Sequence, residues 1–126
     1  MHLSVFREHY DVHSEDELRM HLGFRYEGKY GAFWITPAKG RFPAMALFIN
    51  DDEACMFYIR EDGDSGFHSL GVDSENFKDE VDFVIDNYQL DRYPRAMMVP
   101  ASQGVSAFEE FFRTGSQPSA VRWFEV

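Results

Sequence analysis

The sequence has a single cysteine, Cys55, among its 126 residues, and this excludes an intramolecular disulfide. Structural disulfides are typical of oxidising compartments, so the scarcity of cysteine favours a reducing one. Long apolar runs are also missing: no stretch approaches the roughly 20 residues that a membrane-spanning helix needs. The first residues, MHLSVFREHYDV, do not resemble a secretory signal peptide. We therefore expect a soluble protein of the cytoplasm with no membrane partner.

Basic residues are scarce as well. Twelve Lys and Arg face 22 Asp and Glu, a net charge of −10. The excess lies in residues 51–91, which hold thirteen acidic residues but only Arg60 and Lys78 as basic ones, a net charge of −11. Binding to nucleic acid needs clustered Lys and Arg, so we expect no nucleic-acid partner. An acidic surface suits a basic protein partner and accelerates its capture, although the same charge also serves solubility alone.

The usual motifs of catalysis and cofactor binding do not occur. The sequence contains no G-x-S-x-G, no G-x-G-x-x-G and no P-loop. Cys55 lies in an apolar run within the acidic third, a setting that disfavours a reactive thiolate and indicates a core position. We expect no catalytic residue and no cofactor.

Two weak metal patterns are present, and neither predicts a site. His9 and His13 are four apart, but the expected helix cap at Ser14 follows both, so the pair does not share a helix face. Residues 62–73 begin like a calcium loop, with acids at positions 1 and 3, yet Phe67 occupies the position that requires glycine. We expect no metal.

Aromatic residues, in contrast, are abundant: 13 Phe, 6 Tyr and 2 Trp. Large rings favour strands and bury much area, so they predict a sheet-rich fold with an aromatic core. Short apolar or alternating runs predict strands over residues 3–6, 30–36, 45–50, 54–60, 67–71, 80–88 and 120–124, with an extended segment over 92–100. Short connections between consecutive strands indicate antiparallel pairing.

Two segments predict helices. Residues 13–23 contain Ser14 as N-cap, Glu17 as its capping-box partner and Gly23 as the C-terminal stop. Residues 102–113 carry an apolar stripe with a period of 3.6 residues. The stripe consists of Val105, Phe108, Phe111 and Phe112, while Glu109, Glu110 and Arg113 are expected to face away. The prediction is an α+β fold: a single domain, residues 1–126, with a mostly antiparallel sheet of about six strands and two helices on one face.

The segment YPRAMMVPASQGVSAFEEFFRTGSQPSAVRW, residues 93–123, resembles the C-terminal signature of the first-numbered immunity protein family of bacterial polymorphic toxin systems. The matching residues are Val99, Pro100, Glu110, Phe111, Thr114, Gly115, Pro118, Val121 and Trp123. The upstream run MFYIREDGDSGFHSLG is similar to the central part of the same family. These residues set a helix end, a turn and a packed tryptophan, so the motif marks the family rather than a site.

The resemblance implies a specific function. Proteins of this family bind a cognate toxin domain in the cytoplasm of the producing cell and block it, and the toxins are often nucleases or nucleic-acid deaminases. Such enzymes grip phosphates and tend to be basic, so an acidic surface would match them. We expect the partner to contact acids of the loops and of one strand face, with tyrosine anchors among them. The expected contact residues are Asp51, Asp52, Glu53, Tyr58, Glu61, Asp62, Asp64, Asp82, Asp86 and Tyr88.

Two other readings stay open at this point. One is an interaction or adaptor module without a toxin partner, which predicts a persistent apolar patch or a homodimer face. The other is a small enzyme with an unrecognised carboxylate site, which predicts a pocket with a carboxylate of displaced pKa.

Overall fold

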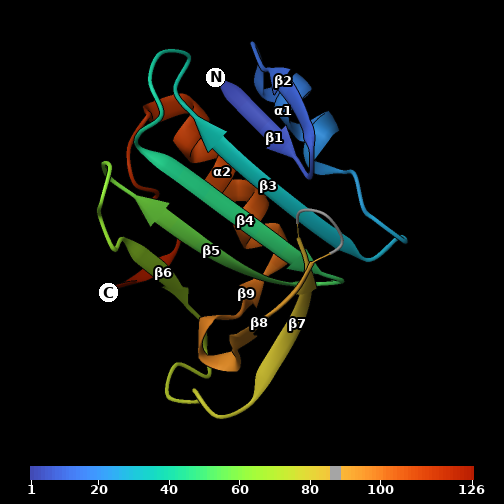
Figure 1. Cartoon of the computed structure of the whole chain (residues 1–126), viewed down its shortest axis with the longest axis vertical. Coiled ribbons are helices and arrows are strands. Elements are labelled where there is room, and N and C mark those ends of the chain that lie inside the picture. Colours follow the sequence, from blue (N-terminus) through green and yellow to red (C-terminus); the bar gives the residue numbers. More distant parts are fainter. Residues whose placement is uncertain (86–88) are drawn as a thin grey trace.

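Three apolar runs form the centre of the sheet: β3 (Tyr30–Thr36), β4 (Ala44–Asn50) and β5 (Glu53–Ile59). In the computed structural model, which describes residues 1–85 and 89–126, they pair antiparallel in sequence order (Figure 1). All residues of β4 are buried except the last, Asn50. A strand that is covered on both faces is apolar throughout instead of alternating, and this accounts for the sequence AMALFI.

The remaining strands extend this sheet on both sides, in the order β10-β6-β5-β4-β3-β1-β2, with β9 paired to β5. All strand pairings between described residues are antiparallel. The outer strands are β1 (His2–Val5), β2 (Glu8–Asp11), β6 (Phe67–Leu70), β9 (Val99–Pro100) and β10 (Arg122–Glu125). β6 and β9 share one edge of β5, β6 along Phe57 and Tyr58 and β9 along Glu53 and Ala54.

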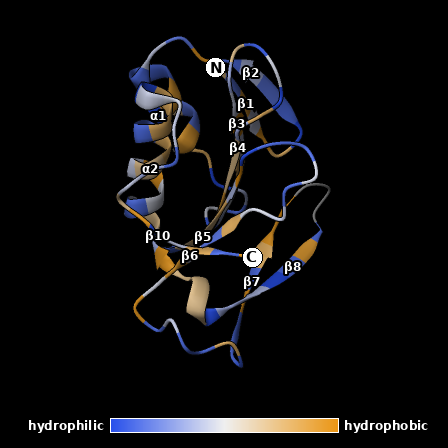
Figure 2. Ribbon diagram, turned by 90° about the vertical axis from the view of Figure 1, so that its left-hand side faces the viewer, coloured by the Kyte–Doolittle hydropathy of each residue, from blue (hydrophilic) through white to orange (hydrophobic). Residues whose placement is uncertain are grey.

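The two helices, α1 (Glu15–Leu22) and α2 (Ala101–Thr114), cover one face of this sheet (Figure 2). Leu18 and Leu22 of α1 and Phe108 and Phe111 of α2 are buried in the main core, against the inward residues of the central strands. Fully burying such side chains contributes about 1.5–3 kcal/mol each, so this layer accounts for much of the stability.

A separate hairpin lies on the other face of the sheet, formed by β7 (Glu80–Val84) and β8 (Leu90–Pro94). Val81 and Phe83 are buried in a second core, whereas Asp82 is exposed, as the alternation in the sequence predicts. The 3-10 helix η2 (Arg95–Met97) follows and leads the chain back to β9.

The predicted fold class is confirmed, but the described residues contain ten strands instead of about six. β2 was missed because its sequence, EHYD, is polar and largely exposed, so it lacks the apolar pattern of a half-buried strand. The segment 92–100 is not one extended run, since η2 divides it into β8 and β9. The strand predicted over 80–88 ends at Val84, and its last part lies outside the described residues.

Both predicted helices are present. The Ser14 side chain accepts a hydrogen bond from the backbone N–H of Glu17, as expected for an N-cap, while the Glu17 carboxylate reaches one residue further back, to the His13 N–H. Gly115 ends α2 in the left-handed conformation, with φ 68°. Gly23 ends α1 as expected, but in a right-handed conformation, with φ −77°.

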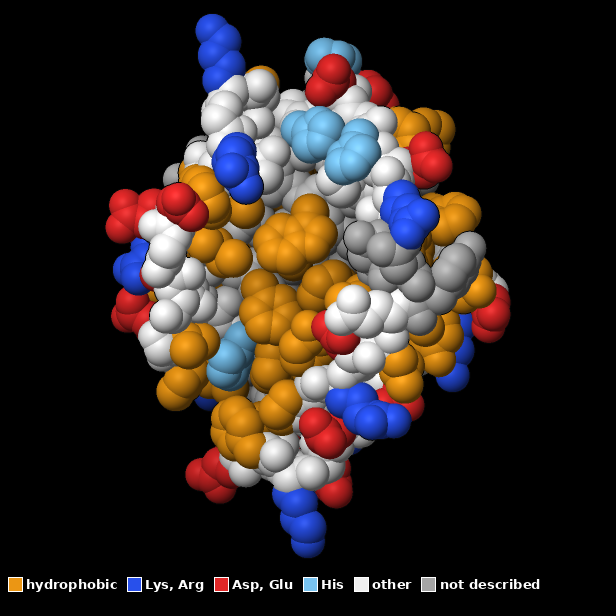
Figure 3. Space-filling view, viewed as in Figure 1, with side chains coloured by type: hydrophobic (Ala, Val, Ile, Leu, Met, Phe, Trp, Pro, Cys, Tyr) orange, Lys and Arg blue, Asp and Glu red, His pale blue; other side chains and the backbone are white. Residues whose placement is uncertain are grey.

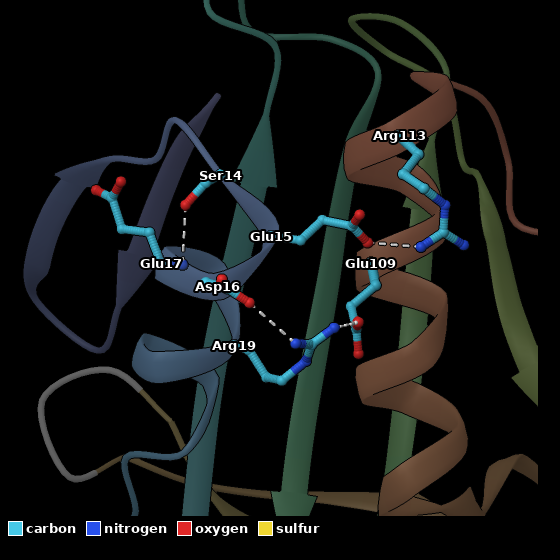
Figure 4. A network of polar contacts seen from close by, with 7 residues as sticks. All are labelled: Ser14, Glu15, Asp16, Glu17, Arg19, Glu109 and Arg113. Atoms are coloured by element: carbon cyan, nitrogen blue, oxygen red, sulfur yellow. Dashed lines mark hydrogen bonds and ion pairs between the residues drawn. The ribbon is translucent and has the colours of Figure 1, made fainter.

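The polar side of α2 was expected to face away, and Arg113 is exposed as expected, whereas the Glu109 side chain is only 15% exposed. Arg113 Nη1 donates to Glu15 Oε1 at 2.6 Å, and Glu109 accepts from Arg19 of α1 (Figure 4). α1 packs beside α2, so this flank of α2 pairs with charged residues of α1. The neighbouring helix could not be inferred from a pattern within α2.

None of the helices in residues 1–85 and 89–126 is long and apolar enough to span a membrane.

Candidate protein-binding surface

The first group of expected contact residues lies at the turn between β4 and β5. Asp51 and Asp52 are both exposed there. The turn is held in place from two sides: the Asp51 N–H donates to the Lys29 carbonyl at 2.9 Å, and the Asp52 carbonyl accepts from the Ala101 N–H at 2.8 Å. Asp51 has a φ of 56°, a conformation that Asp tolerates better than most residues. The two carboxylates are therefore presented on a fixed backbone.

Two further acids of this group are paired with arginines. Arg95 Nη1 lies 2.7 Å from Glu53 Oε1, and Arg92 Nε lies 3.0 Å from Asp82 Oδ1. The side chain of Asn50 joins the turn to β7 by donating to the Asp82 carbonyl at 2.8 Å. Of these acids, Asp51 and Asp52 thus offer the most available negative charge.

The second group lies in the loop 60–66, which joins β5 to β6. Glu61 and Asp62 are exposed, but the Asp64 side chain is only 8% exposed and accepts two hydrogen bonds from the Arg60 guanidinium and one from the Arg60 N–H. These hydrogen bonds lower the pKa of Asp64 far below its ordinary value. Asp64 therefore orders the loop, and its carboxylate is not free for a partner.

The two acidic groups lie at opposite ends of β5. The seven residues of this strand span roughly 20 Å at about 3.3 Å per residue. The described acids among the expected contact residues therefore lie in two places instead of forming one cluster. The sequence could not reveal this division, because it follows from the direction of the strand.

The three remaining expected contact residues are not on the described surface. Tyr58 is 6% exposed and packs its ring against Phe67, Phe111 and Trp123 in the main core. It was expected as an exposed anchor and is instead a core residue, because it lies on the helix-facing side of β5. Asp86 and Tyr88 lie outside the described residues.

The sheet face opposite the helices carries an apolar hollow that the sequence reasoning missed. Figure 3 shows hydrophobic side chains gathered at the centre of this face, surrounded by charged ones. The apolar hollow has a volume of about 330 Å³. It is lined by Phe6, Ala32, Trp34, Phe48, Phe57, Ile59, Ser65, Phe67, Ile85 and Tyr93.

The floor of the hollow is a set of packed rings. Phe48 and Tyr93 stack with their planes 3° apart, and Trp34 meets Phe48 edge-on. Trp34 is 38% exposed, although it belongs to a strand near the centre of the sheet. The hydroxyl of Tyr93 donates to Asp91 at 3.1 Å, and burial raises the pKa of Tyr93 well above its ordinary value. An apolar surface is thus left open over a base of packed rings.

The hollow exists because the second layer is incomplete on this face. The hairpin β7–β8 covers Cys55 and Ala46, but it does not extend over Trp34 and Ile59. One sequence signal could have indicated it: β3 and β5 carry large apolar residues on both faces, whereas only two helices and one hairpin are available to cover them.

The residues of the C-terminal signature form one connected unit. The Gly115 N–H donates to the Phe111 carbonyl, and the Glu110 carboxylate accepts from the backbone and the hydroxyl of Ser119. Trp123 Nε1 donates to the Pro118 carbonyl at 2.8 Å. The other members of the signature also make structural contacts. Val99 and Pro100 pair with Ala54 and Glu53 of β5, and the Thr114 hydroxyl donates to the Glu110 carbonyl. Val121 is buried in the main core.

Comparison with known families gives a match over nearly the whole chain. The family model described as Immunity protein Imm1 matches residues 8–125. Among curated proteins no match was found. Because the family match includes the C-terminal signature, both helices and all described strands except β1, the chain belongs to the Imm1 family of immunity proteins.

Proposed function

We propose that this protein binds a cognate toxin domain and neutralises it, with its exposed carboxylates guiding a basic partner. The observation that carries the proposal is the Imm1 family match over residues 8–125. The charge supports it, since a net charge of −10 favours capture of a basic protein. The contact residues proposed on this basis are Asp51, Asp52, Glu53, Glu61, Asp62 and Asp82, to which Asp64 contributes by ordering its loop.

The proposed target is a toxin that acts on nucleic acid, a nuclease or a deaminase. Such an enzyme binds phosphates through Lys and Arg, so its surface is complementary to the exposed acids described above. The proposed place of action is the cytoplasm of the cell that makes both proteins, where an uninhibited toxin would meet its substrate. In this role the protein needs no catalytic residue, metal or cofactor of its own.

The enzyme alternative gains no support from the hollow. Its ten lining residues include neither Asp nor Glu, and the carboxylate with a displaced pKa, Asp64, is held ionised by Arg60 instead of being kept protonated for acid catalysis. An adaptor without a toxin partner would also use an apolar surface. The family match favours the toxin as the partner.

The test is affinity purification of the tagged protein from its native host at low salt, with the bound proteins identified by mass spectrometry. The expected partner is a toxin domain that kills cells when it is expressed alone and is harmless when this protein is expressed with it. A partner whose toxicity is unchanged by co-expression would contradict the proposal. The control is the same experiment with an unrelated acidic protein of similar size, which should neither bind nor protect.

A further inference from the structure

We propose that the apolar hollow receives one large apolar side chain of the toxin domain, presented on a loop that also carries Lys or Arg. This inference rests on the proposed function and deepens it, because it names the point of contact. It differs from the expectation drawn from sequence, which placed the contact on acidic residues with tyrosine anchors supplied by this chain.

The hollow is an exposed apolar surface over packed rings. An exposed apolar patch that is rimmed by polar residues is typical of an interaction site. Trp34 and the stacked pair Phe48 and Tyr93 offer such a surface on strands whose backbones are fixed by the sheet. Interface hot spots have this form: an anchor enters a pocket, and surrounding polar contacts exclude water.

The second argument concerns the polarity of the lining. Small-molecule sites combine an apolar wall with several converging polar groups that fix the orientation of the ligand. Here only Trp34, Ser65 and Tyr93 have polar side-chain atoms, and the hydroxyl of Tyr93 is already bonded to Asp91. The hollow therefore suits an apolar side chain better than a metabolite.

The third argument is the charge on either side of the hollow. One side is the loop 60–66, with three acids and one arginine. The other is the hairpin, whose described residues, 80–85 and 89–94, hold three acids and one arginine. Both flanks are net acidic, so the loop that delivers the anchor should be basic.

The same charges argue against a second copy of this chain as the occupant. A two-fold dimer would place identical patches against each other, so the acidic flanks of two molecules, each with a net charge of −10, would meet. Such a contact is opposed by repulsion of like charges.

The experiment measures the kinetics of toxin binding for two hollow variants of the full chain. Trp34→Ala removes the open edge of the aromatic floor, and Ser65→Trp places a ring at the rim from an exposed loop position. We expect each to raise Kd roughly 30-fold, mainly through faster dissociation, as for the loss of a hot-spot contact. The matched control is Met20→Ala, an exposed apolar truncation on α1, which should change Kd less than about twofold.

A second pair of variants distinguishes the contribution of the apolar anchor to binding from the contribution of the acidic flank. Glu61→Lys and Asp62→Lys alter one flank without touching the lining. We expect them to slow association at low salt by about tenfold and to leave dissociation nearly unchanged, because exposed charges act on the encounter. If the hollow variants change mainly the dissociation rate constant and the flank variants mainly the association rate constant, the hollow holds the anchor and the flank steers the encounter.

The outcomes are distinguishable. If wild type binds the toxin and both hollow variants bind equally well while remaining folded by circular dichroism, the inference is wrong and the proposed function stands. If wild type fails to bind any toxin, both are wrong. Dimerisation of wild type in analytical ultracentrifugation that Ser65→Trp abolishes, or a small molecule released on denaturation, would assign the hollow to another occupant and overturn the inference.

Discussion

The hydroxyl of Ser69 donates a 2.7 Å hydrogen bond to the carbonyl of Met97, a residue 28 positions later in the chain. The same oxygen accepts from the Met56 N–H at 2.9 Å, and the Ser69 side chain is completely buried. It lies beyond the two β5–β6 pairs, Phe57 with His68 and Tyr58 with Phe67. The Ser69 hydroxyl thus links β5, β6 and the end of η2, and it fixes the part of the sheet on which the hairpin packs.

We predict that Ser69→Ala lowers the free energy of unfolding by about 2–4 kcal/mol, because it leaves a buried N–H and a buried carbonyl without their partner. Urea denaturation followed by tryptophan fluorescence measures this change. Ser116→Ala, on an exposed turn, should cost less than about 0.5 kcal/mol. Equal stability of the two variants would contradict the role assigned to the Ser69 hydroxyl.

We predict that Gly71→Ala destabilises the fold by at least about 3 kcal/mol. A methyl group on Gly71 would lie 1.6 Å from the Met98 carbonyl oxygen, so the backbone that carries the Gly71 N–H to the Ala96 carbonyl must move. Thermal denaturation measures the loss. The matched change is Gly23→Ala, whose methyl group finds ordinary contact distances and should alter stability by less than about 1 kcal/mol.

We predict that Cys55 does not react with thiol reagents in the folded protein. Its side chain is 0% exposed, so a reagent cannot reach the sulfur, and burial raises the pKa of the thiol, which disfavours the reactive thiolate. Labelling with Ellman's reagent should be complete in denaturant and slower by orders of magnitude in buffer, at the rate of local or global opening. Rapid labelling of the native protein would show that the second core is open.

We predict a pH-dependent effect of Asp64→Asn. The Arg60 guanidinium holds the folded-state pKa of Asp64 below its unfolded value, so this group stabilises the fold above about pH 4, the ordinary carboxylate range, and loses that contribution as pH falls. The variant should be less stable than wild type at pH 7, and the difference should shrink as the pH is lowered below 4. Denaturation curves between pH 2 and pH 7 measure it. Asp62→Asn, on the same loop but exposed, should show a smaller difference at pH 7.

We predict that the double variant Asp51→Asn and Asp52→Lys slows association with the toxin by several-fold to about tenfold at low salt, with little change in dissociation. Asparagine is chosen at position 51 because it tolerates the positive φ. Surface plasmon resonance at two salt concentrations measures both rates. The control is Glu27→Gln with Glu8→Lys, which makes the same change in charge outside the acidic third and also alters one residue of positive φ, Glu27. Association rates that match those of the control would contradict steering by this turn.

Predictions that depend on neighbours within a few residues were confirmed. The cap at Ser14, the left-handed end of α2 at Gly115 and the hairpin turn at Asn50–Glu53 each follow from hydrogen bonds or backbone preferences spanning two to four residues. The apolar stripe of α2 is confirmed in part, since Phe108 and Phe111 are buried while Val105 and Phe112 are partly buried against the core.

Predictions about surface and partners failed where they required knowledge of distant contacts. Tyr58 looked like an anchor among acids, but the pleat of β5 turns it toward α2. Asp64 looked like a free charge, but it accepts hydrogen bonds from Arg60, whose guanidinium also donates to Glu125 of the distant strand β10. The pairs Arg19–Glu109 and Arg113–Glu15 join residues 90 and 98 positions apart, so no local pattern could indicate them.

The sequence by itself determined both helices, most of the strands, the α+β class, the acidic middle third and the family, because each depends on composition or on local sequence pattern. Only the tertiary structure decided that the expected contact acids divide between two ends of β5 and that an apolar hollow opens between two acidic flanks. Strand direction, register and the reach of a covering hairpin set these features. They are properties of how distant segments pack, and a one-dimensional pattern carries little information about that.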